Sequence, residues 1–286
     1  MPDAQGRMIV AGEQHTLPRM EESVTATTIL FNELTREEIR ALAPEAIALL
    51  PVGATEQHGP HLPVGTDHFA VEHIAREAAR GVADRLPIVV TPTLPFGSSH
   101  HHLPFSGTLS LGTETYYRVM TDLVESLLID GFRRVFVLNG HGGNNELIQL
   151  AVRDLALKRE ADLAAASYWT IAWNDLVGVE AQRYGRFPGH AGTFETSLVM
   201  ALRPELVREP RPHRDDIAAW STDPAPAYRL ERYGTWQAMN GYTDSPDRGE
   251  GERGELFLKT VAEAVGRALT EFYVTTGGTL REDHGG

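Results

Sequence analysis

The chain contains no cysteine among its 286 residues, so disulfide bonds and thiolate metal sites are excluded and any metal ligand must be nitrogen or oxygen. It also lacks the apolar run of about 18 residues that a membrane-spanning helix requires. Residues 1–28 show no basic stretch followed by an apolar run, the pattern of a secretory signal. We therefore expect a soluble, cytoplasmic protein without a membrane partner.

Positive charge is scarce, because 26 Lys and Arg residues face 39 Asp and Glu residues, which gives a net charge of −13. This excess of negative charge repels phosphate groups, so we expect no nucleic-acid partner. The nucleophile elbow G-x-S-x-G, the zinc motif H-E-x-x-H and the phosphate-binding P-loop are all absent. The glycine run at 140–145 lacks the spacing of a dinucleotide fingerprint, which argues against nucleotide redox chemistry.

The length suits one α/β domain near the upper limit of its size range. We expect a polar N-terminal arm at 1–28 and a single domain at 29–286. An irregular insertion, rich in Pro, Arg, Asp and Gly, interrupts this domain at about 204–252. A long irregular stretch of this kind is typical of a lid, a binding loop or an oligomer contact.

Short apolar runs alternate with segments of helical spacing along the domain. Thr35 and Glu38 have the spacing of a capping box at a helix start. The expected strands are 47–52, 87–90, 135–138 and 163–168, and the expected long helices are 67–86, 113–130, 145–158 and 254–273. This alternation predicts a three-layer α/β/α sandwich with a mainly parallel central sheet, whose binding sites lie at the carboxyl ends of the strands.

Five residues with metal-ligand chemistry lie beside these predicted strands and helices. Glu56, His58 and Asp67 share one Gly/Pro-rich loop after the first strand, and His141 lies in a glycine turn after the third. Glu195 lies near the start of a further helix. Each residue alone is as well explained as an exposed side chain or a helix cap, but together these carboxylates and imidazoles suit zinc, manganese or iron, and a carboxylate can bridge two ions.

Other side chains are candidates for contact with a substrate. Ser99 and His102 lie in the loop after the second strand, where tandem histidines are either solvated or partly turned toward a site. Gly142 in the glycine turn is a further candidate. Trp169 and Trp173 flank the end of the fourth strand, and they either cap a pocket or pack under a loop.

The motifs together make the chain similar to the creatininase (creatinine amidohydrolase) family. The resemblance covers roughly residues 45–270, in order. It rests on Glu56-Gln-His-Gly-Pro-His61 with Asp67, on Gly97-Ser-Ser99 with His102 and Phe105-Ser-Gly-Thr108, on Asn139-Gly-His-Gly-Gly-Asn144, on His190-Ala-Gly-Thr-Phe-Glu-Thr-Ser197 and, more weakly, on Gly241-Tyr-Thr-Asp-Ser-Pro246.

The resemblance implies two divalent ions per subunit, of zinc, manganese or iron, and hydrolysis of C–N bonds in cyclic or linear amides. By motif, Glu56 and His141 hold one ion, His58 holds the other, and Asp67 bridges the two. Family members also form homo-oligomers, commonly hexamers, so we expect such an assembly, with the 204–252 insertion as the place for subunit contacts.

Two departures from the creatinine-hydrolysing enzyme bear on the site. That enzyme has a His-x-Glu motif where this chain has His141-Gly-Gly143, so the carboxylate for the second ion must come from elsewhere, and Glu195 is the natural substitute. The aromatic residue that precedes its catalytic histidine is also not evident, since Arg186-Phe-Pro-Gly189 stands there. Both departures argue against creatinine as the substrate.

The expected mechanism is attack by metal-activated water on an amide carbonyl. We expect His190 to act as the catalytic proton shuttle, because an imidazole titrates near neutral pH. The substrate class stays open between a lactam, a formamide and the C-terminal dipeptide of a small modified peptide, as in the peptidase branch of the family. A metal-binding scaffold without turnover is the alternative from another functional class.

Overall fold

The computed structural model describes residues 29–183, 185–215 and 231–281, and the statements below concern these residues. The predicted arm at 1–28 lies outside them, as does part of the predicted insertion. Within the described ranges, no helix combines the length and the apolar character that crossing a membrane requires.

The centre of the molecule is a sheet of four parallel strands in the order β2-β1-β3-β4. The strands are β1 (Ile47–Val52), β2 (Ile88–Val90), β3 (Arg134–Asn139) and β4 (Asp162–Ser167). Strands β1 and β3 are buried along their whole length, as their continuous apolar sequences require when helices cover both faces. The four strands predicted from the sequence are therefore confirmed.

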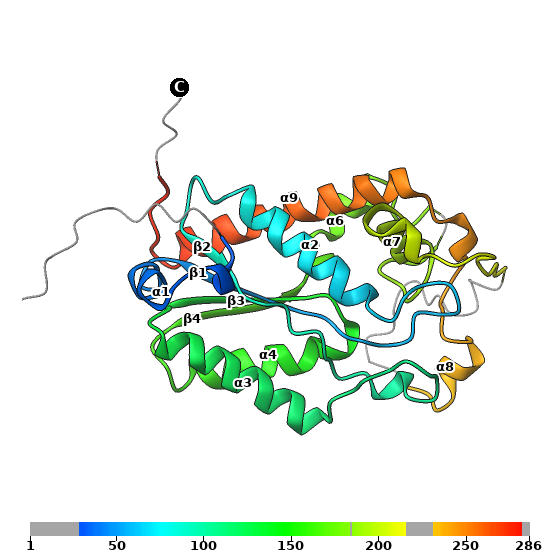
Figure 1. The fold of residues 1–286 in the computed structure, drawn as a ribbon, viewed down its shortest axis with the longest axis horizontal. Coiled ribbons are helices and arrows are strands. Elements are labelled where there is room, and N and C mark those ends of the chain that lie inside the picture. Colours follow the sequence, from blue (N-terminus) through cyan, green and yellow to red (C-terminus); the bar gives the residue numbers. More distant parts are fainter. Residues whose placement is uncertain (1–28, 184, 216–230, 282–286) are drawn as a thin grey trace, which may run out of the picture.

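Helices cover both faces of this sheet (Figure 1). Helices α2 (Thr66–Arg80) and α9 (Gly251–Thr275) pack on one face, and α3 (Thr113–Ile129) and α4 (Asn145–Ala156) pack on the other. Alternate residues of β1 serve the two cores, since Ile47 joins the core on the α2 side and Ala48 the core on the α3 side. This arrangement confirms the predicted three-layer sandwich.

The shorter elements join these layers. Helix α1 (Arg36–Leu42) begins with the predicted capping box, in which Thr35 and Glu38 each accept from the other's backbone N–H. The remaining helices are α5 (Tyr168–Ile171), α6 (Trp173–Gly178), α7 (Thr193–Leu202) and α8 (Thr235–Ala238), and the single 3₁₀ turns are Phe31–Glu33, His100–His102, Gly142–Asn144, Pro204–Leu206 and Pro246–Arg248.

Helices α7 and α9 approach each other closely. A Cβ atom at position 254 would overlap the carbonyl oxygen of Ser197, so this contact requires the glycine in α9. The contact fixes the first turn of α7 beside the carboxyl end of the sheet, where the loops after β1, β2 and β3 and the short helix after β4 also lie. The predicted ligands and substrate contacts therefore lie at one end of the sheet.

Candidate metal centre

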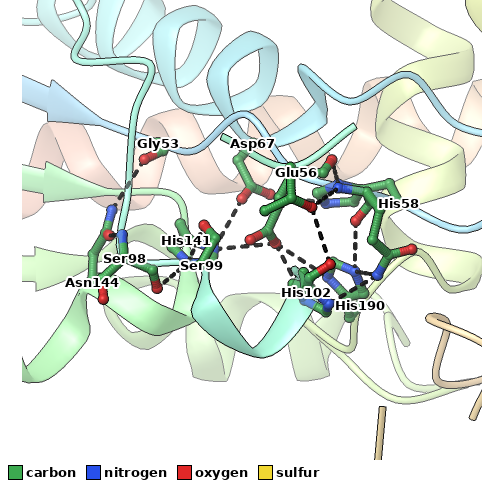
Figure 2. Close-up of polar contacts among 12 residues, drawn as sticks. Gly53, Glu56, His58, Asp67, Ser98, Ser99, His102, His141, Asn144 and His190 are labelled. Carbon is green, nitrogen blue, oxygen red and sulfur yellow. Dashed lines mark hydrogen bonds and ion pairs between the residues drawn. The ribbon is translucent and has the colours of Figure 1, made fainter. Parts of the chain in front are cut away.

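The five predicted metal ligands converge at this end of the sheet. Figure 2 shows four of them, Glu56, His58, Asp67 and His141. Their ligand atoms form two groups, in each of which all atoms lie within 4.8 Å of one another. One group is Glu56, Asp67 and His141, and the other is His58, Asp67 and Glu195. All five side chains are buried, and Asp67 belongs to both groups.

Asp67 presents one carboxylate oxygen to each group. It lies in the first turn of α2, with Oδ1 3.0 Å from His58 Nε2 and Oδ2 3.1 Å from His141 Nδ1. A carboxylate whose two oxygens face different imidazoles has the geometry that bridging between two cations requires.

Both histidines also have the ring orientation that a metal ligand needs. Nδ1 of His58 lies 3.1 Å from the carbonyl oxygen of Glu56, and Nε2 of His141 lies 3.2 Å from the carbonyl oxygen of Ser98. Because a carbonyl can only accept, each of these nitrogens carries a hydrogen. The other nitrogen of each ring faces the carboxylates and is the one that would bind a metal after losing its proton, which is the usual orientation of metal-bound histidine.

The carboxylates themselves fit a bound cation. Both oxygens of Glu56 and Oδ2 of Asp67 are buried and accept no hydrogen bond from the described residues. Burying an ionised carboxylate without partners costs several kcal/mol, on the order of a lost charged hydrogen bond or more. A divalent ion in each group would compensate this cost, so the residues present fit divalent metals.

Burial and neighbouring charges shift the pKa values of the side chains in this cluster. Burial alone would raise the pKa of Asp67, but His58 and His141 hold it well below its usual range. Burial alone would lower the pKa of His58, but Asp67 and the other carboxylates raise it to about 10. Burial raises the pKa of Glu195 to about 8. Without metal the group of His58 and Glu195 therefore retains protons that a bound cation would displace.

Glu195 lies where it could supply the carboxylate that position 143 cannot supply. It lies in the first turn of α7, with Oε2 3.7 Å from His58 Nε2, and it accepts a hydrogen bond from the backbone N–H of Ala191. A Cβ at Gly143 would overlap the carbonyl oxygen of Ser98 and crowd the ring of His141. The departure from the His-x-Glu motif therefore has a steric reason.

His190 lies beside the two groups of candidate ligands. Its Nδ1 is 3.6 Å from Glu56 Oε1, and its ring centroid is 4.4 Å from that of His58. Burial and the neighbouring histidines hold the pKa of His190 well below its usual range. Thr243 fixes the backbone at this position, because it donates to the carbonyl of His190 and accepts from its N–H, both at 2.9 Å. The lowered pKa keeps this imidazole neutral, whereas the proton-shuttle role was expected from titration near neutral pH, and that role stays a prediction.

A pocket of about 500 Å³ opens onto the cluster. Three of the predicted substrate contacts, His102, Gly142 and Trp169, line it together with His190. Ser99 does not. Its side chain is fully buried, with Oγ 3.2 Å from His141 Nε2, so it lies behind the histidine and helps to orient it.

Trp173, the other tryptophan considered with Trp169, does not line this pocket either, and it packs on Phe187 with ring centroids 4.5 Å apart. Of the two roles expected for Trp173, the structure therefore supports packing.

Two residues near the pocket were not predicted from the sequence, Trp236 and Gln57. Trp236 lies on α8 within the insertion, and its ring centroid is 4.5 Å from that of His102 and 5.3 Å from that of His101. No periodic pattern in the insertion indicates this placement. Gln57 lies inside the ligand-bearing loop, where its position between Glu56 and His58 was the only available signal.

A larger groove, of about 970 Å³, runs between α2 and α9. None of the metal-competent groups found among residues 29–183, 185–215 and 231–281 lies in it. The groups of candidate ligands therefore lie at the smaller pocket.

Comparisons with known proteins agree with this placement. Residues 32–269 match the Creatininase family, described as creatinine amidohydrolase. Creatinine amidohydrolase of Pseudomonas putida is 30% identical over 268 residues, which are 87% of this chain and 99% of that protein. Mycofactocin precursor peptide peptidase of Mycobacterium ulcerans (strain Agy99) is 35% identical over 165 residues, 56% of this chain and 59% of the peptidase.

Solved structures show the same relationship. A crystal structure of creatinine amidohydrolase (creatininase) superposes with a TM-score of 0.72 at 27% identity, and covers 87% of this chain and 99% of that one. A manganese form of creatininase is similar to the same degree, with 86% of this chain covered and 99% of that one. The chain therefore belongs to the creatininase family, as a hydrolase acting on carbon–nitrogen bonds other than peptide bonds.

Proposed function

We propose that the chain is an amidohydrolase that uses two divalent ions to cleave an amide, lactam or formamide bond in a small molecule. Zinc, manganese and iron all suit its nitrogen and oxygen ligands. The observation that carries the proposal is Asp67, which directs its two oxygens to His58 and to His141 at 3.0 and 3.1 Å. This arrangement supports two ions that share one carboxylate.

Divalent ions in such a site supply Lewis acidity and lower the pKa of water toward neutrality. The chain's own residues do the rest. Glu56, Asp67 and Glu195, which are buried side chains at the end of the pocket, would hold the positive charge. His190 takes a proton at Nδ1, the ring nitrogen that faces Glu56, and returns it to the leaving nitrogen as the C–N bond breaks.

The pocket limits the size of the substrate. Its volume of about 500 Å³ suits a small molecule or a short peptide end. A peptidase acting on a small modified peptide is the second candidate, and the 35% identity to the mycofactocin precursor peptide peptidase favours it. Creatinine is disfavoured as substrate, because the chain lacks the carboxylate and the aromatic residue noted at positions 143 and 186–189.

Two measurements test the proposal together. Mass spectrometry of the purified protein gives metal per chain, and a panel of lactams, formamides and short peptides gives activity with zinc, manganese and iron separately. We expect about two ions per chain and hydrolysis of at least one amide class. One ion per chain would contradict the dinuclear site, and full metal with no hydrolysis across the panel would favour the non-catalytic scaffold.

We also propose that the insertion at 204–252 contributes to contacts in a homo-oligomer. Tyr233 within it is fully exposed, and aromatic side chains are enriched at protein interfaces. Sedimentation velocity measures the particle mass, and a particle of 31.5 kDa would be a monomer and would contradict this proposal.

A further inference from the structure

Gln57 contacts His102 and His190, whose rings both lie near the carboxylate of Glu56. Its side-chain nitrogen is 2.9 Å from His102 Nδ1, 2.9 Å from His190 Nε2 and 3.0 Å from the carbonyl oxygen of Gly241. The glutamine is buried, as are both histidines. It therefore contacts two imidazoles of the site without being a candidate ligand itself.

The contact made by the side-chain oxygen of Gln57 fixes the orientation of this amide. Gln57 Oε1 lies 2.9 Å from the backbone nitrogen of Gly59. A backbone N–H can only donate, so the atom that faces it must be the amide oxygen. The NH₂ group then faces the two histidines, with two hydrogens to give.

Three neighbours surround these two hydrogens, so one of them receives none. His190 Nε2 lies 2.9 Å from the amide nitrogen and 3.0 Å from the backbone carbonyl oxygen of Gln57. An unprotonated Nε2 would take one amide hydrogen and leave that carbonyl, and either Gly241 or His102, without a donor from this group. A hydrogen on Nε2 satisfies all three, so we assign the ring hydrogen of His190 to Nε2. The two amide hydrogens therefore go to Gly241 and to His102 Nδ1.

The two rings consequently carry opposite tautomers. His102 accepts at Nδ1, so its hydrogen is on Nε2, which lies 3.5 Å from Glu56 Oε1. His190 donates at Nε2, so its Nδ1 is unprotonated, and it lies 3.6 Å from the same oxygen. The N–H of His102 and the unprotonated Nδ1 of His190 thus both face Glu56 Oε1, in the lining of the pocket.

We propose that Gln57 is a positioning residue that fixes these opposite tautomers, through its side chain for His102 and through its carbonyl for His190. The N–H of His102 then faces the Glu56 carboxylate at 3.5 Å, while the free Nδ1 of His190 stays available for the proton that hydrolysis releases. The catalytic meaning rests on the proposed amidohydrolase function. The tautomers themselves do not depend on it.

The test uses the whole zinc-loaded protein labelled with ¹⁵N-histidine. Zinc is diamagnetic, so nitrogen chemical shifts report which ring atom carries the hydrogen, and the H102N and H190N variants assign the signals. The informative variant is Gln57→Glu, which keeps the shape but replaces the amide donor with an acceptor. Gln57→Met removes the donor without adding charge, and Gln149→Glu, at an exposed position on α4, is the matched control.

We expect wild-type His102 to carry hydrogen on Nε2 and wild-type His190 to carry it on Nε2. In Gln57→Glu the hydrogen of His102 moves to Nδ1, and kcat falls by about 10–100-fold with little change in KM or metal content. Gln57→Met gives a mixture of His102 tautomers and a kcat that also falls. Gln149→Glu changes neither measurement.

Wild-type His102 with hydrogen on Nδ1, or unchanged His102 shifts in Gln57→Glu, would overturn the inference. If wild type hydrolyses an amide and Gln57→Glu keeps its kcat within about twofold, the positioning role is overturned even where the tautomers are as expected. If wild type hydrolyses no amide and the His102 shifts still move, the proposed function fails and the tautomer assignment stands. The two proposals are therefore separable.

Discussion

Oε2 of Glu195 lies 3.7 Å from Nε2 of His58, so a carboxylate from α7 meets an imidazole from the loop that follows β1. The two segments belong to different parts of the chain, and no local motif links them. Their meeting completes the second group of candidate ligands, in which Asp67 is the shared member.

Replacing Glu195 with Gln should remove one ion and keep the other. The amide is a weak ligand, whereas Glu56, Asp67 and His141 remain intact. We expect mass spectrometry to give about one ion per chain and kcat to fall by about 100-fold or more. Glu263→Gln, at an exposed position on α9, should keep both. Two ions in the Glu195→Gln protein would exclude Glu195 as a ligand.

Replacing Asp67 with Ala should remove both ions, because each group of ligands loses its shared oxygen donor. Asp122→Ala, exposed on α3, is the control and should retain metal and activity. The checks are metal per chain and turnover after reconstitution with zinc. An Asp67→Ala protein with full metal and unchanged activity would remove the proposed mechanism.

The variant His190→Ala tests whether His190 transfers a proton or binds metal. Its ring is the predicted proton shuttle and none of the five candidate ligands, so we expect metal content to be unchanged while kcat falls by about 10²–10⁴-fold. His73→Ala, on α2 and outside the pocket, should leave both unaffected. Loss of metal in His190→Ala would instead indicate that His190 is a ligand, as its grouping with Glu56 and His58 permits.

Gly143→Ala tests the steric reason for the glycine. A Cβ at this position would overlap the carbonyl oxygen of Ser98, so the neighbouring backbone must shift, and we expect a loss of about 1–3 kcal/mol in the free energy of unfolding. Gly142→Ala is a close control, because a Cβ there meets nothing within 4 Å. Urea denaturation of the two variants measures the difference, and equal stabilities would refute the steric account.

Metal removal should make stability depend on pH in a defined direction. The folded chain holds a proton on Glu195 up to about pH 8, against an ordinary value of 4.5, and on His58 up to about pH 10, against 6.5. A folded state that binds more protons loses stability as pH rises. The contribution of Glu195 is therefore lost as pH rises from 4.5 to 8, and that of His58 as it rises from 6.5 to 10.

Thermal unfolding from about pH 6 to about pH 9 measures this effect. We expect the Tm of chelator-treated protein to fall across this range and that of zinc-loaded protein to change less, since the metal replaces the two protons. A metal-free Tm that rises with pH would contradict the assignment of protons to Glu195 and His58.

Much of the fold is predictable from local patterns. The apolar run of β1 and the capping box of Thr35 and Glu38 each specify one element, and the structure confirms both. The helices α5 and α6 were not predicted, because Tyr168–Ile171 and Trp173–Gly178 are too short to show a helical period. Their positions depend on packing against α9 rather than on their own sequences.

The candidate site was also predictable only in part. Glu56, His58 and Asp67 are close in sequence, and their link to His141 and Glu195 was predicted from ligand chemistry beside a strand end and a helix start, with the resemblance to known motifs in agreement. The place of Trp236 depends on how the insertion folds back over the pocket, which no local signal encodes. Ser99 shows the opposite case, since its loop was located but its side chain points to the back of His141.

The close contact between Gly143 and Ser98 also limits how such a centre changes during evolution. This backbone has no room for a side chain at position 143, so a carboxylate beside His141 would require a displaced strand-end loop as well as the new side chain. A single substitution to Glu at this position would therefore not be enough to create a ligand there.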